Sequence, residues 1–224
     1  MEDASQNELL DTQDGSHTLI SKRFGVSYHS KYGAIKESEH VFIDAGLKAR
    51  MQRDKDALSI LEYGFGTGLN AYLALLCAQQ YHRDISYTGI EAFPISKELA
   101  ASLNYPQVLQ RPVDDYLQLH DLDWDVPHQI NEHFTFTKVL GQIEDQTFNA
   151  QFDVLFFDAF APTAQPELWE EQLLQKAFQA LKPGGIFVTY CAKGVVKRTL
   201  KSIGFKVEAL PGPPGKREMT RGIK

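Results

Sequence analysis

Cysteine is scarce in this chain of 224 residues, and long apolar runs are missing. The two cysteines, Cys77 and Cys191, lie far apart, which excludes a disulfide framework or a zinc ribbon and favours a reducing compartment, by default the cytoplasm. The longest apolar stretches, 73–78 and 154–157, are far shorter than the ~20 residues of a membrane helix. The N-terminus lacks the basic start and apolar core of a signal peptide. The sequence therefore predicts a soluble protein without a membrane partner.

Positive charge is also in short supply, because the formal net charge is −6. A negative balance argues against a nucleic-acid partner, since neutralising phosphates takes a local excess of Lys and Arg. The charge is unevenly distributed, however. Residues 193–224 hold nine basic and two acidic residues, a balance of +7, which leaves −13 for residues 1–192. This basic segment could orient a polyanion, or it could be a solvated helix face.

Composition is otherwise ordinary for a globular protein, with 43% hydrophobic and 23% charged residues. We predict a small N-terminal β-containing cap over 1–55, with a hairpin, and a main domain over 56–224. In the main domain, strands alternate with helices, which predicts a doubly wound, Rossmann-like α/β sheet. The predicted strands are 17–20, 24–28, 58–63, 85–90, 134–140, 152–157, 186–191 and 205–209. The predicted helices are 69–80, 95–103, 107–119, 167–181 and 194–203, with a loop at 121–132 and no regular structure between the hairpin and residue 56.

Three glycines, Gly64, Gly66 and Gly68, form a turn between the first strand of the main domain and its helix. Open parallel sheets bind ligands at the carboxyl ends of their strands, where glycines let the backbone approach and helix amides point at the ligand. The spacing is G-x-G-x-G, with Leu69 where the dinucleotide fingerprint has its third glycine, which disfavours nicotinamide and flavin cofactors. Glu91, after the next strand, is placed to accept hydrogen bonds from ribose hydroxyls.

Segment 62–70, E-Y-G-F-G-T-G-L-N, resembles the first S-adenosylmethionine (AdoMet) motif of class I methyltransferases, in the form found in the MnmC/MnmD family. The resemblance extends from about residue 15 to the last residue. Its other segments, in the same order as in the family, are 28–30, 39–43, 91–94, 158–162, 166–169, 182–185 and 215–219.

The resemblance implies AdoMet as the cofactor. The residues that it assigns to cofactor binding are Glu62, Gly64, Phe65, Gly66, Thr67, Gly68, Asn70 and Glu91. In relatives, an Asp in a G-D-I segment meets the adenine amine. The matching segment here is 141–143, G-Q-I, so Gln142 takes that position with its amide carbonyl as acceptor, and Glu144 and Asp145 are alternatives.

The resemblance also implies an activity, the methylation of the 5-aminomethyl group of wobble uridine or 2-thiouridine, in the anticodon region of tRNA, to 5-methylaminomethyl. In fused members of the family a flavin-dependent oxidase follows and generates the free amine. Because this chain ends at Lys224, the resemblance implies a stand-alone methyltransferase and a separate enzyme that supplies the amine.

Asp158, directly after the apolar strand 152–157, is the candidate catalytic residue. An alkyl amine has a pKa of about 10 and is mostly protonated at neutral pH, so a carboxylate could position it and accept its proton. The alternative role for Asp158 is to cap the next turn. Phe160, Pro162 and Trp169 are candidates for an apolar wall or for base stacking, with core packing as the alternative for Trp169.

The predicted phosphate contacts are basic residues of the C-terminal segment, two of them presented by the stiff bend 211–215. They are Lys193, Lys197, Arg198, Lys201, Lys216 and Arg217. The seven histidines have no H-E-x-x-H or comparable spacing, so no metal is predicted. Two other functions stay open, an AdoMet-dependent methyltransferase acting on a small-molecule or protein amine, and a non-catalytic AdoMet-fold subunit that partners an oxidase.

Overall fold

The computed structural model describes residues 7–224, which form two β-sheets flanked by helices. The strands are β1 (Glu8–Asp11), β2 (His17–Ser21), β3 (Val26–Ser27), β4 (Leu58–Tyr63), β5 (Ile85–Glu91), β6 (Pro127–Asn131), β7 (Phe134–Leu140), β8 (Phe152–Phe157), β9 (Leu181–Thr189), β10 (Lys206–Pro211) and β11 (Glu218–Ile223). The α-helices are α1 (Ala34–Ser38), α2 (Ala49–Met51), α3 (Leu69–Tyr81), α4 (Lys97–Ala101), α5 (Tyr105–Leu109), α6 (Asp114–Asp121), α7 (Glu171–Ala180) and α8 (Gly194–Ile203). The other helical segments are the π-helix η2 (Glu39–Lys48) and the 3₁₀ helices η3 (Ile143–Asp145) and η4 (Pro166–Trp169).

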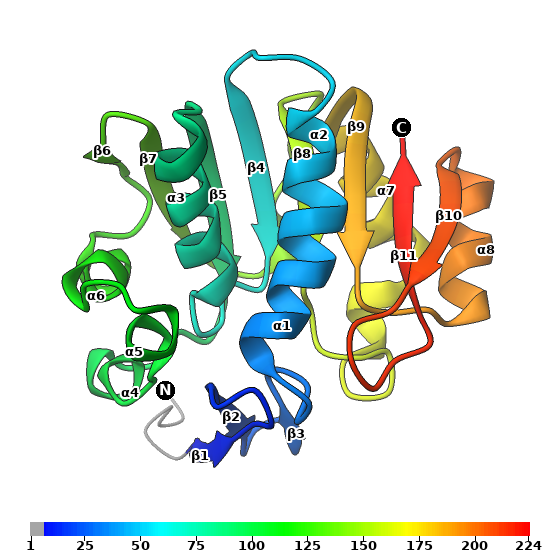
Figure 1. The fold of residues 1–224 in the computed structure, drawn as a ribbon. Coiled ribbons are helices and arrows are strands. Elements are labelled where there is room, and N and C mark those ends of the chain that lie inside the picture. The colour runs from blue at the N-terminus through cyan, green and yellow to red at the C-terminus, as the bar shows by residue number, and fades with distance from the viewer. Residues whose placement is uncertain (1–6) are drawn as a thin grey trace.

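The central sheet has the strand order β10-β11-β9-β8-β4-β5-β7-β6. Strands β9, β8, β4, β5 and β7 run parallel, while β6, β11 and β10 add antiparallel edges. The small antiparallel sheet β1-β2-β3 lies beneath the carboxyl ends of the parallel strands (Figure 1). This arrangement confirms the predicted doubly wound α/β fold with an N-terminal β-containing cap. Within residues 7–224, no helix has the length and apolar character needed to cross a membrane.

The two central strands, β4 and β8, are buried along almost their whole length. Every residue of β8 is buried, as expected of a parallel strand covered on both faces. Figure 1 shows the helical run α1-η2-α2 and helix α3 on one face of the sheet, with α7 and α8 on the other. The continuous apolar strands therefore supply the rigid platform whose carboxyl ends carry the candidate site.

The helical run α1-η2-α2 was not expected from the sequence, which predicted no regular structure there. Charged and polar residues interrupt its apolar positions, but Ile35, Phe42 and Leu47 are buried. Gly46 lets the helix approach the sheet, since a Cβ there would lie 2.9 Å from a methyl group of Val188. Packing against the sheet thus stabilises a helix whose local sequence signal is weak.

Several predicted bounds are also corrected. The loop predicted at 121–132 contains strand β6, where Pro127 is tolerated as the first residue of an edge strand. The helix predicted at 107–119 is two helices, α5 and α6, separated by Gln110 in the left-handed conformation. The helix predicted at 167–181 is divided into η4 and α7, and β9 already begins at Leu181. Strand β11 was missed because its alternating polar residues and Gly222 conceal its buried positions.

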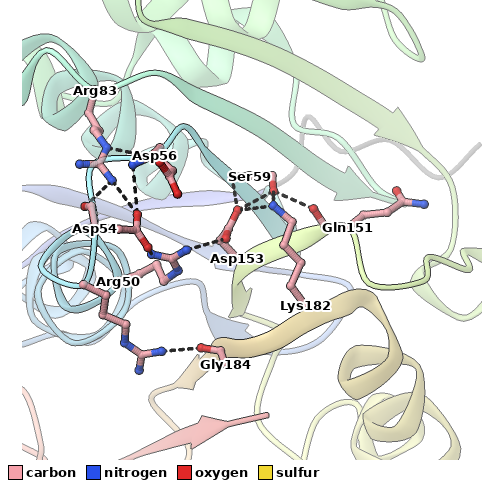
Figure 2. A network of polar contacts seen from close by, with 10 residues as sticks. Arg50, Asp54, Asp56, Ser59, Arg83, Gln151, Asp153, Lys182 and Gly184 are labelled. Carbon is pink, nitrogen blue, oxygen red and sulfur yellow. Dashed lines mark hydrogen bonds and ion pairs between the residues drawn. The ribbon is translucent and has the colours of Figure 1, made fainter.

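A charged network closes the amino end of the sheet, away from the small sheet (Figure 2). Asp153, at the start of β8, accepts hydrogen bonds from Lys182 Nζ at 2.7 Å and from Arg50 Nη2 at 3.0 Å. The backbone N–H and the hydroxyl of Ser59 donate to the same carboxylate at 3.0 and 2.9 Å. These donors outweigh the effect of burial and lower the pKa of Asp153. The network therefore links β4, β8, β9 and helix α2 through the Asp153 carboxylate, whose charge is balanced by Lys182 and Arg50.

Candidate functional site

The glycine turn after β4 is held at the carboxyl end of the sheet by backbone hydrogen bonds. Gly64, Gly66 and Gly68 have φ angles of 89°, 52° and 74°, in the region that disfavours other residues. Gly64 also allows a close approach, because a Cβ there would lie 2.9 Å from the carbonyl oxygen of Asp158. The Asp158 N–H donates to Tyr63 O at 3.0 Å. The turn and the residue that follows β8 are thus fixed against each other.

A cavity opens between this turn and the N-terminal cap. Residues that line it from different elements are Phe24, Tyr28, Gly66, Glu91, Gln142 and Asp158. The cavity therefore brings together most of the residues predicted for the cofactor and the catalytic candidate. The cap aromatics Phe24 and Tyr28 were not predicted, although Tyr28 begins the family-like segment 28–30.

Glu91 lies at the end of β5 with its carboxylate facing the glycine turn. One oxygen accepts from the Gly66 N–H and the other from the Phe93 N–H, both at 2.8 Å. Burial nevertheless raises its pKa. A carboxylate offers about four lone-pair sites, so two remain for hydroxyl groups of a ligand. The side chain can therefore support the turn and bind a ribose at the same time.

Two of the three adenine candidates line the same cavity, Gln142 and Glu144. The Gln142 side chain makes no cap to η3, and it is exposed. Oε2 of Glu144 is buried without a hydrogen-bond partner among the described residues. Asp145 is exposed and is not among the lining residues. An unpartnered acceptor in a cavity is suited to an amino group of a ligand.

Asn70, at the start of α3, joins two carboxyl groups. Its Nδ2 donates to Glu62 Oε1 and to Asp158 Oδ2, each at 2.8 Å. Burial raises the pKa of both acids well above the ordinary values, and the charge of Asp158 raises that of Glu62 further. Asn70 Oδ1 and Glu62 Oε2 are left without hydrogen-bond partners among residues 7–224. The cluster therefore has acceptor capacity for a cationic or N–H-bearing ligand.

Phe65 and Thr67 support the turn from the core. The Phe65 ring packs 5.5 Å from that of Phe136. The Thr67 hydroxyl contacts Tyr105 Oη at 3.2 Å, and the Thr67 carbonyl accepts from Tyr116 Oη at 2.7 Å. These contacts give both side chains a structural role in shaping the turn.

A second, open hollow is lined by Pro162, two residues after Phe160, which lines the first cavity. Three of the predicted phosphate contacts, Lys193, Lys216 and Arg217, line this basic groove.

Two of the predicted phosphate contacts already have acidic partners. Lys216 pairs with the buried Glu37 at 2.6 Å, and its Nζ lies 3.9 Å from the centre of the Tyr190 ring. Lys197 pairs with Glu218 at 2.6 Å. Arg198 and Lys201 lie on α8 but do not line the groove. The positive charge of the C-terminal segment is therefore only partly available to a partner.

Trp169 does not line either hollow. Its ring packs 4.8 Å from that of Phe157, and its Nε1 donates to Phe160 O at 2.8 Å. Trp169 thus holds the segment that carries Phe160, which is the core role that the sequence left open.

AdoMet is a nucleoside with a positively charged sulfonium and an amino-acid tail, and the residues of the cavity fit it. Glu91 has acceptor capacity for a ribose, and Glu144 has a free oxygen for an amino group. The unpartnered Oδ1 of Asn70, which lines the cavity, suits a cationic group. Gly66 leaves room that a side chain would take, since a Cβ there would lie 3.1 Å from the Tyr28 ring. The class that the fold and this cavity define is that of AdoMet-dependent enzymes.

A family model described as S-adenosyl-L-methionine-dependent methyltransferase matches residues 105–224. The chain belongs to this methyltransferase family, which confirms AdoMet as the expected cofactor.

The chain is 32% identical over 220 residues to the tRNA 5-methylaminomethyl-2-thiouridine biosynthesis bifunctional protein MnmC of Marinomonas sp. (strain MWYL1), covering 90% of this chain and 32% of that protein. The protein of the same name from Leptospira borgpetersenii serovar Hardjo-bovis (strain JB197) is 31% identical over 220 residues, with 92% and 33% covered. The chain thus spans about a third of the length of these curated relatives. The resemblance found in the sequence is confirmed.

Solved structures agree with this placement. MnmC2 from Aquifex aeolicus superposes with a TM-score of 0.77 at 28% identity, covering 96% of this chain and 69% of that one. Spermidine synthase from Thermotoga maritima superposes with a TM-score of 0.53 at 14% identity, covering 97% and 70%, which shows a shared fold alone.

Proposed function

We propose that the chain methylates the primary amine of 5-aminomethyluridine or 5-aminomethyl-2-thiouridine at the wobble position of tRNA. The observation that carries this proposal is the buried Asp158, whose carboxyl group lines the cofactor cavity and is held there by a hydrogen bond from Asn70 Nδ2. The MnmC relatives are named for tRNA 5-methylaminomethyl-2-thiouridine biosynthesis, which supports the same substrate.

In the proposed site, Glu91 would hold the ribose of the cofactor, and Gln142 or Glu144 would accept from its adenine amine. The backbone of Gly64, Gly66 and Gly68 leaves the space in which the cofactor lies. When bound, AdoMet supplies an electrophilic methyl group. Asn70, which lines the cavity, would offer its unpartnered Oδ1 to the charged part of the cofactor, and Glu62 would hold Asn70 from behind by accepting from its Nδ2.

Asp158 is the proposed proton acceptor. The substrate amine is mostly protonated at neutral pH, so it must lose a proton before its nitrogen can act as a nucleophile. The ammonium N–H donates to the Asp158 carboxylate, which then takes the proton. Burial raises the pKa of Asp158 and so brings its basicity closer to that of the amine. Asn70, which donates to the same carboxylate at 2.8 Å, fixes its orientation.

The tRNA is proposed to lie along the basic groove. Lys193 and Arg217 line it and form no ion pair among residues 7–224, so they are the proposed phosphate contacts in the groove, with Arg198 on α8 as a further contact. Phe160 and Pro162 form the apolar wall between the groove and the cavity. A splayed-out base needs such a surface, because single-stranded RNA is recognised largely through unstacked bases.

A small-molecule or protein amine is the second candidate acceptor. Its support is the neutralisation of Lys216 by Glu37 and of Lys197 by Glu218, which lowers the positive charge available to RNA. Such an acceptor would use the same Asp158 and the same cofactor cavity.

The decisive experiment is nucleoside mass spectrometry of tRNA that carries 5-aminomethyluridines, after incubation with the protein and AdoMet. We expect a gain of one methyl group on those nucleosides, and none when tRNA is digested with ribonuclease beforehand. Methyl transfer from labelled AdoMet to other amines but not to tRNA would support the second candidate. Loss of AdoMet without any acceptor, or no turnover, would contradict both.

A further inference from the structure

A cluster of three side chains with metal-binding chemistry lies far from the AdoMet cavity. It consists of His82, Glu132 and His133, and its ligand atoms all lie within 4.8 Å of one another. His82 caps the end of α3, and the other two form the turn between β6 and β7. In Figure 1, the end of α3 and this turn lie at the upper edge, opposite the small sheet and the glycine turn. The cluster therefore belongs to no part of the proposed methyl-transfer site.

The two histidines are held in place by different means. His82 ends α3 in the left-handed conformation, with φ 48° and ψ 53°, and its ring centre lies 5.5 Å from that of His133. His133 Nδ1 lies 2.7 Å from the carboxylate of Asp84. With a proton on Nδ1, donated to Asp84, the Nε2 of His133 carries the lone pair. A carboxylate on the far nitrogen is the usual support of a metal-binding histidine.

The distance between two of the candidate ligand atoms is that of a tetrahedral site. His133 Nε2 lies 3.5 Å from Glu132 Oε1. Ligands about 2.1 Å from Zn²⁺ at tetrahedral angles lie ~3.4 Å apart, so these two atoms need almost no movement. The third ligand atom, on His82, is within 4.8 Å of both and belongs to an exposed side chain. A rotation of that ring would complete the set.

We propose that His82, Glu132 and His133 form a divalent transition-metal site for which Zn²⁺ is the fitting ion, with Asp84 as the positioning residue for His133. Two imidazoles and one carboxylate are a donor set typical of Zn²⁺, with a fourth position left to water. The ligands come from segments 50 residues apart, which is why spacing within a short motif predicted no metal. A bound ion would pin the β6–β7 turn to the end of α3 and so stabilise this edge of the sheet.

The test is titration of the untagged, metal-free full chain with Zn²⁺ by calorimetry, together with Co²⁺ absorption spectroscopy. We expect one tight site per chain, visible d–d bands of tetrahedral Co²⁺, and a rise in melting temperature of about 5 °C at an ion concentration 100-fold above Kd. His82→Ala and Glu132→Gln should each abolish the tight site. Asp84→Asn should weaken it about 10-fold, because it acts only by orienting His133.

The matched control is His40→Ala, which removes a histidine outside the cluster and should leave one Zn²⁺ site. Methyl transfer should be unchanged by His82→Ala, Glu132→Gln and Asp84→Asn, so failure of the metal proposal and failure of the proposed function are separable. Zn²⁺ binding that persists in both His82→Ala and Glu132→Gln, or the absence of a tight site in the unaltered chain, would overturn the proposal.

Discussion

One aspartate lies near the start of strand β8 and another directly follows its end. The pKa values of their carboxyl groups are shifted in opposite directions. Asp153 begins the strand inside a network of Lys182, Arg50 and Ser59, and its pKa is lowered (Figure 2). Asp158 directly follows the strand, and burial, together with the negative charge of Glu37, raises its pKa. At the amino end of the sheet, basic side chains thus balance the charge of the Asp153 carboxylate. At the carboxyl end, the Asp158 carboxyl group has little such compensation. The difference separates a residue that stabilises the fold from one that is available for chemistry.

The sharpest way to test this comparison is Asp158→Asn. We expect methyl transfer to fall about 10²- to 10⁴-fold, because the proton acceptor is lost while the shape is kept. Calorimetry should find AdoMet affinity almost unchanged. An equal loss of AdoMet affinity would instead move Asp158 into the cofactor site.

The same variant should be more stable than the unaltered chain at neutral pH. A carboxyl group whose folded-state pKa is raised destabilises the fold above that pKa, and the cost disappears as pH falls towards the ordinary value. The gain in stability of Asp158→Asn should therefore shrink on acidification. Melting curves recorded across the pH range would reveal this trend.

The opposite result is expected at the other end of β8. Asp153→Asn should lower the free energy of unfolding by about 2 kcal/mol, because it removes the carboxylate partner of Lys182 and one of the two carboxylate partners of Arg50. Methyl transfer by the folded fraction should be unchanged. Since the folded-state pKa of Asp153 is lowered, its contribution is present above the ordinary pKa and is lost as pH falls through the folded value.

Denaturant unfolding measures this effect, and Asp56→Asn is the matched control. Asp56 is an exposed residue of the same region, so its substitution should change stability by less than about 0.5 kcal/mol. Equal effects of the two substitutions would show that the network around Asp153 contributes little.

The sequence was enough to predict the middle of the fold. The apolar strand at 152–157 and the glycine turn at 64–68 each carry a local signal, and both lie where they were expected. The helical run at 34–51 and β11 were missed because tertiary packing, rather than local pattern, stabilises them. The hydrogen-bond partners within the site could not be predicted from the sequence either. Asn70 and Asp158 are 88 residues apart, and no periodicity relates them.

The contact between Lys216 and Glu37 is the extreme case, because 179 residues separate its partners. The sequence predicted Lys216 as a phosphate contact from the basic segment alone. In the structure its ammonium pairs with Glu37 and lies over Tyr190, and its charge acts on Asp158 by lowering the pKa of that carboxyl against the effect of burial. Lys216 is thus a positioning residue whose charge partly compensates the carboxyl end of β8.

Lys216→Met should therefore increase the difference between the pKa values of Asp153 and Asp158. Removal of the cation should raise the pKa of Asp158 further, so the acidic limb of the pH profile of kcat/KM should move to higher pH. Lys216→Arg, which keeps the charge, should restore the original limb. Lys193→Met removes a cation from the same groove but not from Glu37, and it should change KM for tRNA without moving the limb. If Lys193→Met and Lys216→Met shift the profile equally, the effect belongs to the net charge of the groove and the specific role of Lys216 is wrong.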